Sequence, residues 1–318
     1  MKINIKKTMI ETTLVLLVLV LVISVFILPF GVAPNAVSFN YKNVTVQTRV
    51  NITNSKPEIL NVAVYESNNF SIKNVTINAG TIKTVLCNAS VRDWNGFTND
   101  IILVNATLWH VVSSNFNVSD NNNSHYTNSS CTLNASGSSY ELGTFICSFD
   151  VWYYSNNGTW NCNVTAMDTF NKSGSNFNST VFYPVYSLNV TDGIDYGNVP
   201  VEGFSNDVGA NLTNLGNMGI NISVEGYGAK RNDGLAMNCS FGNISVANEK
   251  FGLISGLDYA ANMTALSGAL NGVLIPNLTI LKQNTSSQVI NTTFWKLYVP
   301  PNPAGNCTGY IIFTALAP

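Results

Sequence analysis

Hydrophobic and polar residues alternate through most of the chain after residue 43. Successive side chains of a β-strand point to opposite faces of its sheet, so a period of two predicts strands with one buried face. Turn sequences such as Trp94-Asn95-Gly96 separate these segments. The predicted strands cover 44–52, 59–65, 72–77, 84–92, 101–112, 145–154, 160–167, 181–190, 220–224, 237–246, 291–299 and 310–315. Short strands at this spacing predict an all-β chain, while the Ala/Leu/Gly-rich segment 253–270 predicts a short helix or a strand pair.

The amino end has a different pattern, in which a continuous apolar run follows a basic start. Three lysines lie within the first seven residues, and residues 14–30 carry no charge. As a helix this run would span about 25 Å of the roughly 30 Å hydrocarbon core, and the lysines favour a cytoplasmic amino end. We interpret residues 1–35 as a cytoplasmic stub and an uncleaved transmembrane helix. A cleaved signal peptide is the alternative, whereas the change of composition at Pro34 argues against a buried core helix.

The segment Thr8-Met9-Ile10-Glu11, followed by the apolar run, resembles the start of a type IV pilin. In that family a glutamate precedes a helix that packs in the core of a filament. Lys6 and Lys7 stand where the family has Gly or Ala before the cleavage point. The resemblance implies a second hypothesis, in which the chain is a subunit of an extracellular surface filament.

Composition narrows the possible functions. Charged residues make up 10% of the 318 residues and the net charge is −2, so clustered basic side chains for nucleic acid are lacking. The chain has 16 Phe, 13 Tyr and 5 Trp, which supply hydrophobic cores and argue against disorder. It has two His, no CxxC and no Gly-x-Ser-x-Gly motif. We therefore predict a non-enzymatic protein with no catalytic residues and no cofactor.

Asparagine is unusually frequent, and much of it lies in sequons for N-glycosylation. The chain has 47 Asn and 24 Asn-x-Ser/Thr sequons, the first at Asn43. Composition alone would give about 8, so the excess indicates acceptors for N-linked glycans in a translocated protein. A bias toward Asn and Thr is the alternative explanation. The candidate acceptors are Asn43, Asn51, Asn74, Asn88, Asn105, Asn163, Asn221, Asn238, Asn243, Asn277 and Asn306.

The residue in the middle of the sequon is often apolar. In a strand, Asn and Thr would then share the outer face while the middle residue points to the core. This arrangement would place glycans on the faces of a sandwich as well as on its loops. The apolar middle residues are Val44, Ile52, Val75, Ala89, Val164, Ile222, Ile244 and Leu278.

Six cysteines lie beyond the apolar run, and an even number outside the membrane suggests three disulfides. Strand parity turns Cys87 and Cys162 toward the core, where they can join two sheets. Cys131 and Cys147 flank a Ser/Gly-rich turn and could join the two strands of a hairpin. Cys239 and Cys307 are each the middle residue of a sequon, and both lie in the last third of the chain. Many pairings are open, and we predict Cys87–Cys162, Cys131–Cys147 and Cys239–Cys307.

The strand from Gly80 to Cys87 resembles the one that carries the first cysteine of the immunoglobulin inter-sheet bridge. Gly158-Thr159-Trp160-Asn161-Cys162 resembles the Gly-x-Tyr-x-Cys of the partner strand, with Trp160 in the Tyr place. The resemblance implies an immunoglobulin-like β-sandwich over residues 36–184.

A second resemblance concerns the last third of the chain. The segments Ile194-Asp195-Tyr196-Gly197-Asn198-Val199-Pro200 and Asn214-Leu215-Gly216-Asn217 are similar to the signature of surface modules of the ASH/Hydin kind. This similarity implies a second immunoglobulin-like sandwich over residues 185–318. The layout of lysine-flanked anchor, Asn-rich sandwiches and many sequons resembles archaeal cell-surface glycoproteins.

Three acidic segments could offer oxygen ligands to Ca²⁺. They begin at Asp93, Asp120 and Asp168, and the first and last follow strands that carry cysteines. An Asp at a strand end followed by Asn and Gly more often forms a plain turn. We therefore assign no metal ligands and keep structural calcium as the lesser alternative.

Two further candidates are aromatic or titratable. His110 and His125 are expected at the surface rather than in a catalytic triad. Trp152, Tyr153 and Tyr154 could stack on sugars or a partner, and a place in the sandwich core or at its edge is the favoured interpretation.

These observations predict a membrane-anchored cell-surface glycoprotein, with its carboxy-terminal bulk outside, in envelope structure or adhesion. Its expected partners are the membrane, N-linked glycans, and other surface proteins or copies of itself, and not nucleic acid. A surface filament subunit is the alternative, and a secreted or surface hydrolase is a distant third.

Overall fold

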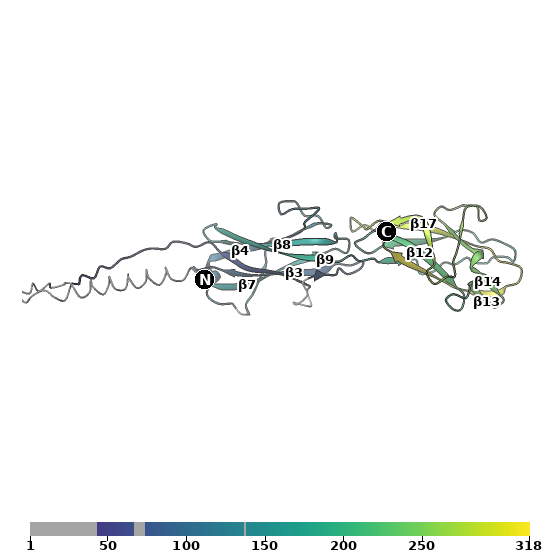
Figure 1. Ribbon diagram of the computed structural model, residues 1–318, viewed down its shortest axis with the longest axis horizontal. Coiled ribbons are helices and arrows are strands. Elements are labelled where there is room, and N and C mark those ends of the chain that lie inside the picture. Colours follow the sequence, from purple (N-terminus) through teal and green to yellow (C-terminus); the bar gives the residue numbers. More distant parts are fainter. Residues whose placement is uncertain (1–42, 67–73, 137) are drawn as a thin grey trace, which may run out of the picture. The chain divides into compact units, whose positions relative to one another are not determined.

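The computed structural model describes residues 43–66, 74–136 and 138–318 (Figure 1). The apolar run at 14–30 and the pilin-like start lie outside these residues, so both stay predictions. Among the residues described, no helix is long and apolar enough to span a membrane. The described chain is all-β, with strands in several sheets beside the one-turn helix α2 (Phe97–Asp100) and the short 3₁₀ helix η1 (Val246–Asn248).

Strands β1–β9 form two sheets, which we call the N-terminal sandwich. One sheet has the order β1 (Glu58–Glu66), β3 (Lys83–Arg92), β7 (Leu142–Val151), β6 (Thr132–Asn134). The other has the order β2 (Asn74–Val75), β9 (Ser173–Phe182), β8 (Gly158–Asp168), β4 (Ile101–His110), β5 (His125–Asn128). All neighbours are antiparallel except β2 and β9. With β1 as strand A and β2 as a short A′ beside strand G, these orders read ABED and A′GFCC′, as in an immunoglobulin sandwich.

Side chains alternate along β3 and β8, so that one face of each strand lies in the core between the two sheets. Inward residues Val85, Cys87, Ala89 and Val91 of β3, and Trp160, Cys162, Val164 and Ala166 of β8, are buried. Their outward neighbours are half-buried or exposed. A disulfide joins Cys87 to Cys162 across the core, with 6.6 Å between the Cα atoms, which is the bridge that parity predicts.

Trp160 takes the core position that tyrosine has in many immunoglobulin strands. Its ring stacks on Phe182 with 4.6 Å between centroids. Its indole N–H donates to the backbone carbonyl of Asn156, at 2.8 Å. In immunoglobulin domains a tyrosine hydroxyl bonds to the backbone a few residues upstream, so here the indole supplies the equivalent bond.

Strands β10–β20 form three sheets, which we call the C-terminal β region. The first has the order β10 (Leu188–Val190), β11 (Val208–Asn214), β18 (Asn291–Leu297), β15 (Glu249–Gly252), β16 (Thr264–Ala265). The second has the order β17 (Val273–Ile280), β12 (Ile220–Tyr227), β20 (Tyr310–Leu316), and the third β14 (Asn243–Ser245), β13 (Leu235–Phe241), β19 (Ala304–Thr308). The third sheet goes beyond the two-sheet sandwich expected from the sequence.

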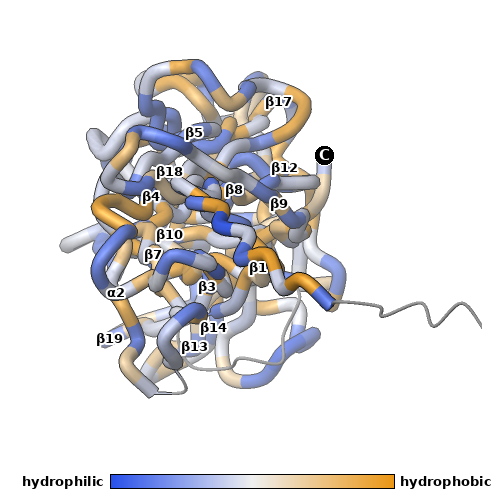
Figure 2. Tube along the Cα trace, turned by 90° about the vertical axis from the view of Figure 1, so that its left-hand side faces the viewer, coloured by the Kyte–Doolittle hydropathy of each residue, from blue (hydrophilic) through white to orange (hydrophobic). Residues whose placement is uncertain are grey.

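The main core of the C-terminal β region surrounds Trp295, and a smaller cluster lies around Ile244 and Leu297. Cys239 and Cys307 are opposite each other on β13 and β19 and form the disulfide of the third sheet. The segment expected as one strand over 237–246 is instead two, because Gly242 turns the chain with φ +70°. Hydrophobic and hydrophilic residues are interspersed along the strands (Figure 2).

The sequon pattern can be compared with burial. The middle residues Val75, Ala89, Val164, Ile222 and Ile244 are buried, and Leu278 is half-buried. These positions confirm the expectation that apolar sequon centres face a core.

Two of the predicted sequon centres do not face a core. Val44 and Ile52 are about four-fifths exposed, and residues 43–52 form no strand. The prediction of a strand over 44–52 is therefore wrong for the described chain. Alternation favours a two-faced strand, but a strand also needs a neighbour to pair with, which this pattern does not supply.

Candidate metal centre

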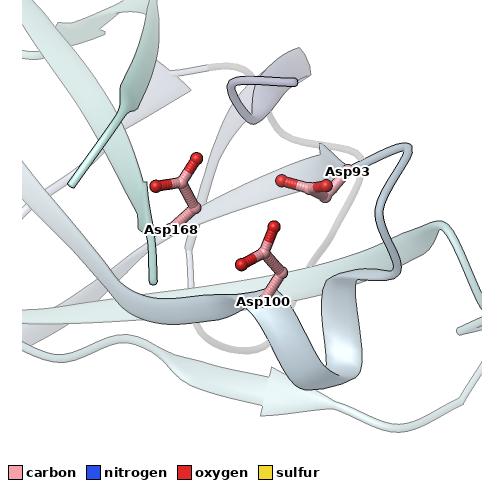
Figure 3. Close-up of side chains that lie close together, drawn as sticks. All are labelled: Asp93, Asp100 and Asp168. Atoms are coloured by element: carbon pink, nitrogen blue, oxygen red, sulfur yellow. The ribbon is translucent and has the colours of Figure 1, made fainter. Parts of the chain in front are cut away.

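Three aspartates of the N-terminal sandwich point toward one another (Figure 3). Asp93 directly follows β3, Asp100 ends α2 just before β4, and Asp168 ends β8. One carboxylate oxygen from each lies within 4.8 Å of the others. All three side chains are buried: Asp93 and Asp168 are 0% exposed and Asp100 is 7% exposed.

A tight turn holds Asp93 in place. Its Oδ1 accepts from the backbone N–H of Asn95, at 2.8 Å. Gly96, with φ +104°, closes the turn and leads into α2. The φ of +104° favours glycine at this position, and a Cβ there would also lie 2.6 Å from the ring of Tyr140.

Asp168 and Asp100 are held by the turn that follows β8. Asp168 Oδ1 accepts from the backbone N–H groups of Phe170 and Lys172, at 2.9 and 2.7 Å. Thr169 donates its hydroxyl to Asp100 Oδ1 and its backbone N–H to the Asp100 carbonyl. The same turn therefore positions both carboxylates.

The chain that precedes β1 also reaches this site. Asn54 donates through Nδ2 to Asp168 Oδ2, at 2.8 Å. Ser55 donates its backbone N–H and its hydroxyl to Asn95 Oδ1, both at 2.8 Å. The segment 53–55 is thus bonded to both acidic turns.

The three carboxylates of the site have few partners that offset their negative charge. Asp93 Oδ2, Asp100 Oδ2 and Asn54 Oδ1 are buried, and none of these three oxygens accepts a hydrogen bond from a residue that the structure describes. None of the ion pairs among the described residues includes the three aspartates. Burial raises the pKa of Asp93, the N–H of Asn95 opposes this, and the charges of Asp100 and Asp168 raise the pKa further. The arrangement can hold a proton or a cation.

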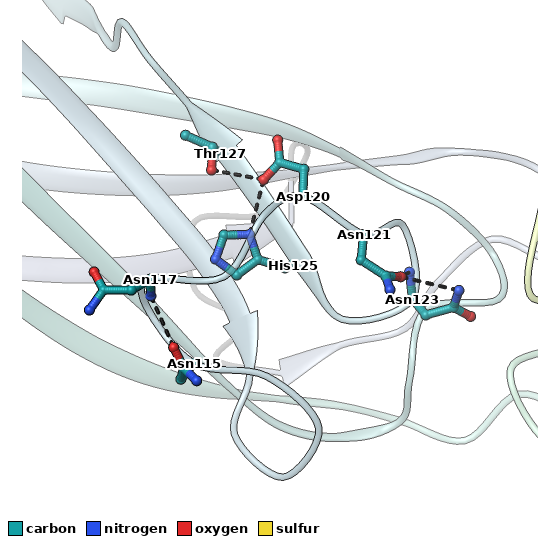
Figure 4. Close-up of polar contacts among 7 residues, drawn as sticks. All are labelled: Asn115, Asn117, Asp120, Asn121, Asn123, His125 and Thr127. Carbon is teal, nitrogen blue, oxygen red and sulfur yellow. Dashed lines mark hydrogen bonds and ion pairs between the residues drawn. The ribbon is translucent and has the colours of Figure 1, made fainter.

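The structure brings together two of the three acidic segments singled out in the sequence. Asp120 lies apart from the cluster, because its exposed carboxylate accepts from His125 Nδ1 at 2.9 Å and from Thr127 at 2.8 Å (Figure 4). Asn121 closes a turn onto the backbone of Asn123. Asp120 therefore belongs to a plain turn.

Two residues of the site were missed in the sequence. Asp100 lies at the end of a one-turn helix without a recognisable motif. Asn54 is 114 residues away from Asp168. Asp100 alone had a local signal, since it is an acid seven residues after Asp93 at the start of the next strand.

The expectation that both histidines lie at the surface is wrong. His110 is 7% exposed and His125 is 2% exposed. The His110 ring packs against Trp160 at 5.6 Å and its Nδ1 contacts the Ser113 hydroxyl. The β4–β5 hairpin turns both rings inward, away from the polar loop that suggested exposure.

The aromatic run after Asp150 lies where the favoured interpretation put it. Tyr153 and Tyr154 are buried, and Trp152 stacks on Tyr154 with 5.5 Å between centroids. Tyr153 and Tyr154 thus belong to the sandwich core, and Trp152 is half-buried at its edge.

Every candidate glycosylation asparagine is at least partly accessible. Six of them are exposed, namely Asn43, Asn51, Asn238, Asn243, Asn277 and Asn306. Those within the longer strands and at β2 are half-buried, namely Asn74, Asn88, Asn105, Asn163 and Asn221.

The third disulfide joins Cys131 to Cys147, so the three bonds have the pairing that the sequence predicts. Structural disulfides persist in oxidising compartments. They therefore indicate an extracellular or surface location.

Comparisons with known proteins add little. No family model and no curated protein matches the chain. One similar solved structure is the chaperone–tip adhesion subunit complex of the archaic Csu pilus of Acinetobacter baumannii, at 10% identity, covering 81% of this chain and 92% of that one, with a TM-score of 0.32. Another is the chaperone–tip adhesin complex of CFA/I fimbriae, at 12% identity, 83% and 84% coverage and a TM-score of 0.29. The C-terminal domain of the Streptococcus agalactiae AgI/II polypeptide BspA is 13% identical, with 81% and 95% coverage and a TM-score of 0.24. At these scores we base no conclusion on them.

Proposed function

We propose that this chain is a non-enzymatic surface glycoprotein with a structural or adhesive role in the cell envelope. An amino-terminal helix at 14–30 would hold it in the cytoplasmic membrane, with its two immunoglobulin-like β modules outside. The layout favours an archaeal envelope. Its partners would be the membrane, its own N-linked glycans, and other surface proteins or further copies of the chain.

The placement of the sequons is the observation that carries this proposal. In the strands, the sequon centre is buried while the asparagine keeps access to solvent, as at Asn88-Ala89-Ser90 and Asn163-Val164-Thr165. A glycan on such an asparagine would leave the core undisturbed. Glycans there would cover sheet faces and protect the backbone from proteases.

Mass spectrometry of the intact protein and of its peptides, from the native source, tests the proposal. We expect an intact amino terminus, three disulfides and glycans on several of the eleven singled-out asparagines. A matched comparison is Asn78, which lies in the same part of the sandwich but outside any sequon and should stay bare. Unmodified sequons throughout would overturn the glycoprotein proposal.

Membrane extraction tests the anchor separately. The protein should stay with membranes in high salt and be released by detergent, because a hydrophobic helix is not displaced by screening of charges. Release by salt alone would exclude an uncleaved anchor.

A filament subunit is the second candidate, and the segment 43–52 favours it. Four apolar residues of this segment have even-numbered positions and would share one face of a strand, yet the segment forms no strand and they are 73–82% exposed: Val44, Val46, Val50 and Ile52. An extended segment of this kind can add to the sheet edge of another molecule.

The two candidates predict different mature proteins. A filament subunit should begin near Thr8 or Ala36 after processing, and Val46→Asp with Val50→Asp should abolish assembly. Gln47→Asp with Arg49→Gln is the matched control, because it lowers the net charge by the same two units at the polar positions and keeps every sequon. Monomeric protein with Met1 intact would favour the simple anchor.

A further inference from the structure

The aspartate cluster and Asn54 contain three buried oxygens that have no hydrogen-bond donor within the described ranges of the chain. They are Oδ2 of Asp93, Oδ2 of Asp100 and Oδ1 of Asn54. A buried acceptor without a partner costs about 1–3 kcal/mol, and a charged one costs more. Because Asn54 Nδ2 is already bonded to Asp168 Oδ2, the carbonyl oxygen of the same amide lies beside the cluster. Oxygens gathered in this way indicate a ligand that carries positive charge.

A proton does not satisfy the site. Two unit charges separated by about 5 Å repel each other by roughly 3 kcal/mol at an effective dielectric constant of 20. A single proton on Asp93 would leave Asp100 and Asp168 charged, and it would leave Asn54 Oδ1 without a donor. One cation can contact all three carboxylates, because one oxygen of each lies within 4.8 Å of the others.

We propose that Asp93, Asp100 and Asp168, together with Asn54, bind one Ca²⁺ ion. Calcium takes carboxylate and amide oxygens at about 2.3–2.6 Å, so ligands on opposite sides of the ion are about 5 Å apart. The carboxylate oxygens here lie within 4.8 Å of one another. Magnesium demands stricter octahedral geometry and keeps several waters, and zinc prefers the nitrogen and sulfur ligands that this set does not contain.

The bound ion has a structural consequence for the chain that enters the sandwich. Asn54 comes from the segment before β1, whereas the aspartates come from the ends of β3, α2 and β8. Calcium therefore fixes the segment 53–55 to two turns that otherwise hold it by side-chain hydrogen bonds alone. This role is independent of glycosylation and of membrane anchoring, so either proposal can fail without the other.

The experiment uses the detergent-solubilised full chain after treatment with EDTA. Calcium is added in a titration calorimeter, and the melting temperature is followed with and without the ion. We expect one Ca²⁺ per chain, with a dissociation constant between about 10⁻⁶ and 10⁻³ M, and a melting temperature that rises with calcium. Magnesium at the same concentration should give a smaller shift.

Asp100→Asn tests the ligand set without loss of the fold. The amide keeps an acceptor for the Thr169 hydroxyl and removes one negative charge, so the EDTA-treated variant should be at least as stable as the EDTA-treated wild type. Its affinity for calcium should fall at least tenfold. Asp120→Asn is the matched control, because it removes an exposed turn carboxylate from the same sandwich, and it should bind like the wild type.

Three results would overturn the proposal. They are no calcium-dependent heat and no change in melting temperature in the wild type, unchanged binding in Asp100→Asn, or loss of binding in Asp120→Asn. A larger shift with zinc than with calcium would assign the site to a different metal and would likewise contradict it.

Discussion

Buried acidic side chains have different partners in the N-terminal sandwich and in the C-terminal β region. In the C-terminal β region, Glu225 receives both of its bonds from Arg231, at 2.8 and 2.5 Å, and Glu249 accepts from the Tyr196 hydroxyl at 2.6 Å. In the N-terminal sandwich, the three clustered aspartates have no cationic partner among the described residues. Glu225 and Glu249 therefore have their partners within the fold, whereas the aspartate cluster has buried oxygens that no described residue satisfies.

The two regions also differ in their cross-links. Cys87–Cys162 joins opposite sheets through the core, and both residues are fully buried. Cys239–Cys307 joins neighbouring strands of one small sheet, where both residues are half-buried. Cys87–Cys162 is thus a bond between layers of the N-terminal sandwich, whereas Cys239–Cys307 is a bond within one layer of the C-terminal β region.

Removing either Cys87–Cys162 or Cys239–Cys307 should cause the largest losses in the free energy of unfolding. The loops span 75 and 68 residues, so chain entropy predicts a loss of about 4 kcal/mol for either pair of Cys→Ala changes. Removing Cys87–Cys162 also leaves a cavity between sheets, so it should cost at least about 1 kcal/mol more than removing Cys239–Cys307. Denaturant unfolding of the two double variants measures the difference. Equal losses would show that the position of the bond does not matter.

Glu249 should make the stability of the C-terminal β region fall as the pH rises from about 4.5 to about 7. Burial raises its pKa from 4.5 to about 7, against the opposing hydrogen bond from Tyr196. Its contribution to stability is therefore fully present below pH 4.5 and lost as the pH rises through about 7. A shift of this size corresponds to about 3 kcal/mol between pH 4 and pH 9.

Glu249→Gln should remove that pH dependence, because the neutral amide keeps the shape of the side chain. The free energy of unfolding at the two pH values, with the wild type alongside, is the measurement. A variant with the wild-type slope would assign the pH dependence to another group.

When calcium is absent, Asp93 should make the stability of the N-terminal sandwich fall as the pH rises, by less than Glu249 does in the C-terminal β region. Its folded pKa lies above the ordinary value of 3.8, so the EDTA-treated chain loses stability as the pH rises through the folded pKa. Calcium should reverse this slope, because the ion binds the ionised carboxylates. Melting temperatures across acidic pH, with EDTA or with calcium, are the test. A slope that calcium leaves unchanged would separate Asp93 from any ion.

The smallest effects should come from single sequons, one in each region. Asn238→Gln, at an exposed position, should remove one glycan mass and change the free energy of unfolding by less than about 0.5 kcal/mol. Asn163→Gln should cost slightly more, because the Asn163 amide donates to Thr165 at 3.2 Å. Peptide mass spectrometry and urea unfolding of both variants decide this. A large loss at Asn238 would mean that its glycan stabilises the fold.

Sequence patterns were informative where a strand determined them. Parity alone turned Cys87 and Cys162 inward, and the alternation around Val164 and Ile222 correctly predicted their burial. The same reasoning failed for residues 44–52, where alternation was present without a strand. It also failed at Gly242, where one positive φ converts a single apparent strand into two.

Only two of the four proposed metal ligands could be recognised from the sequence, for a different reason. Asp93 and Asp168 stand at strand ends before turns, a position with a local signature. Asn54 has none, because its role depends on the path of the chain before β1. A ligand set assembled from four separate segments can be recognised only after the sheets have placed those segments together.

The side-chain contacts of Asn54 and Ser55 have a mechanical consequence. A pull on the chain at residue 52 meets these contacts before it reaches β1, the edge strand whose register with β3 begins at Glu58 and Arg92. Tension is therefore shared between the turns after β3 and β8, and the latter strand is central in the opposite sheet. The hydrogen bonds of Asn54 and Ser55 would therefore have to break before the edge strand β1 could separate from β3.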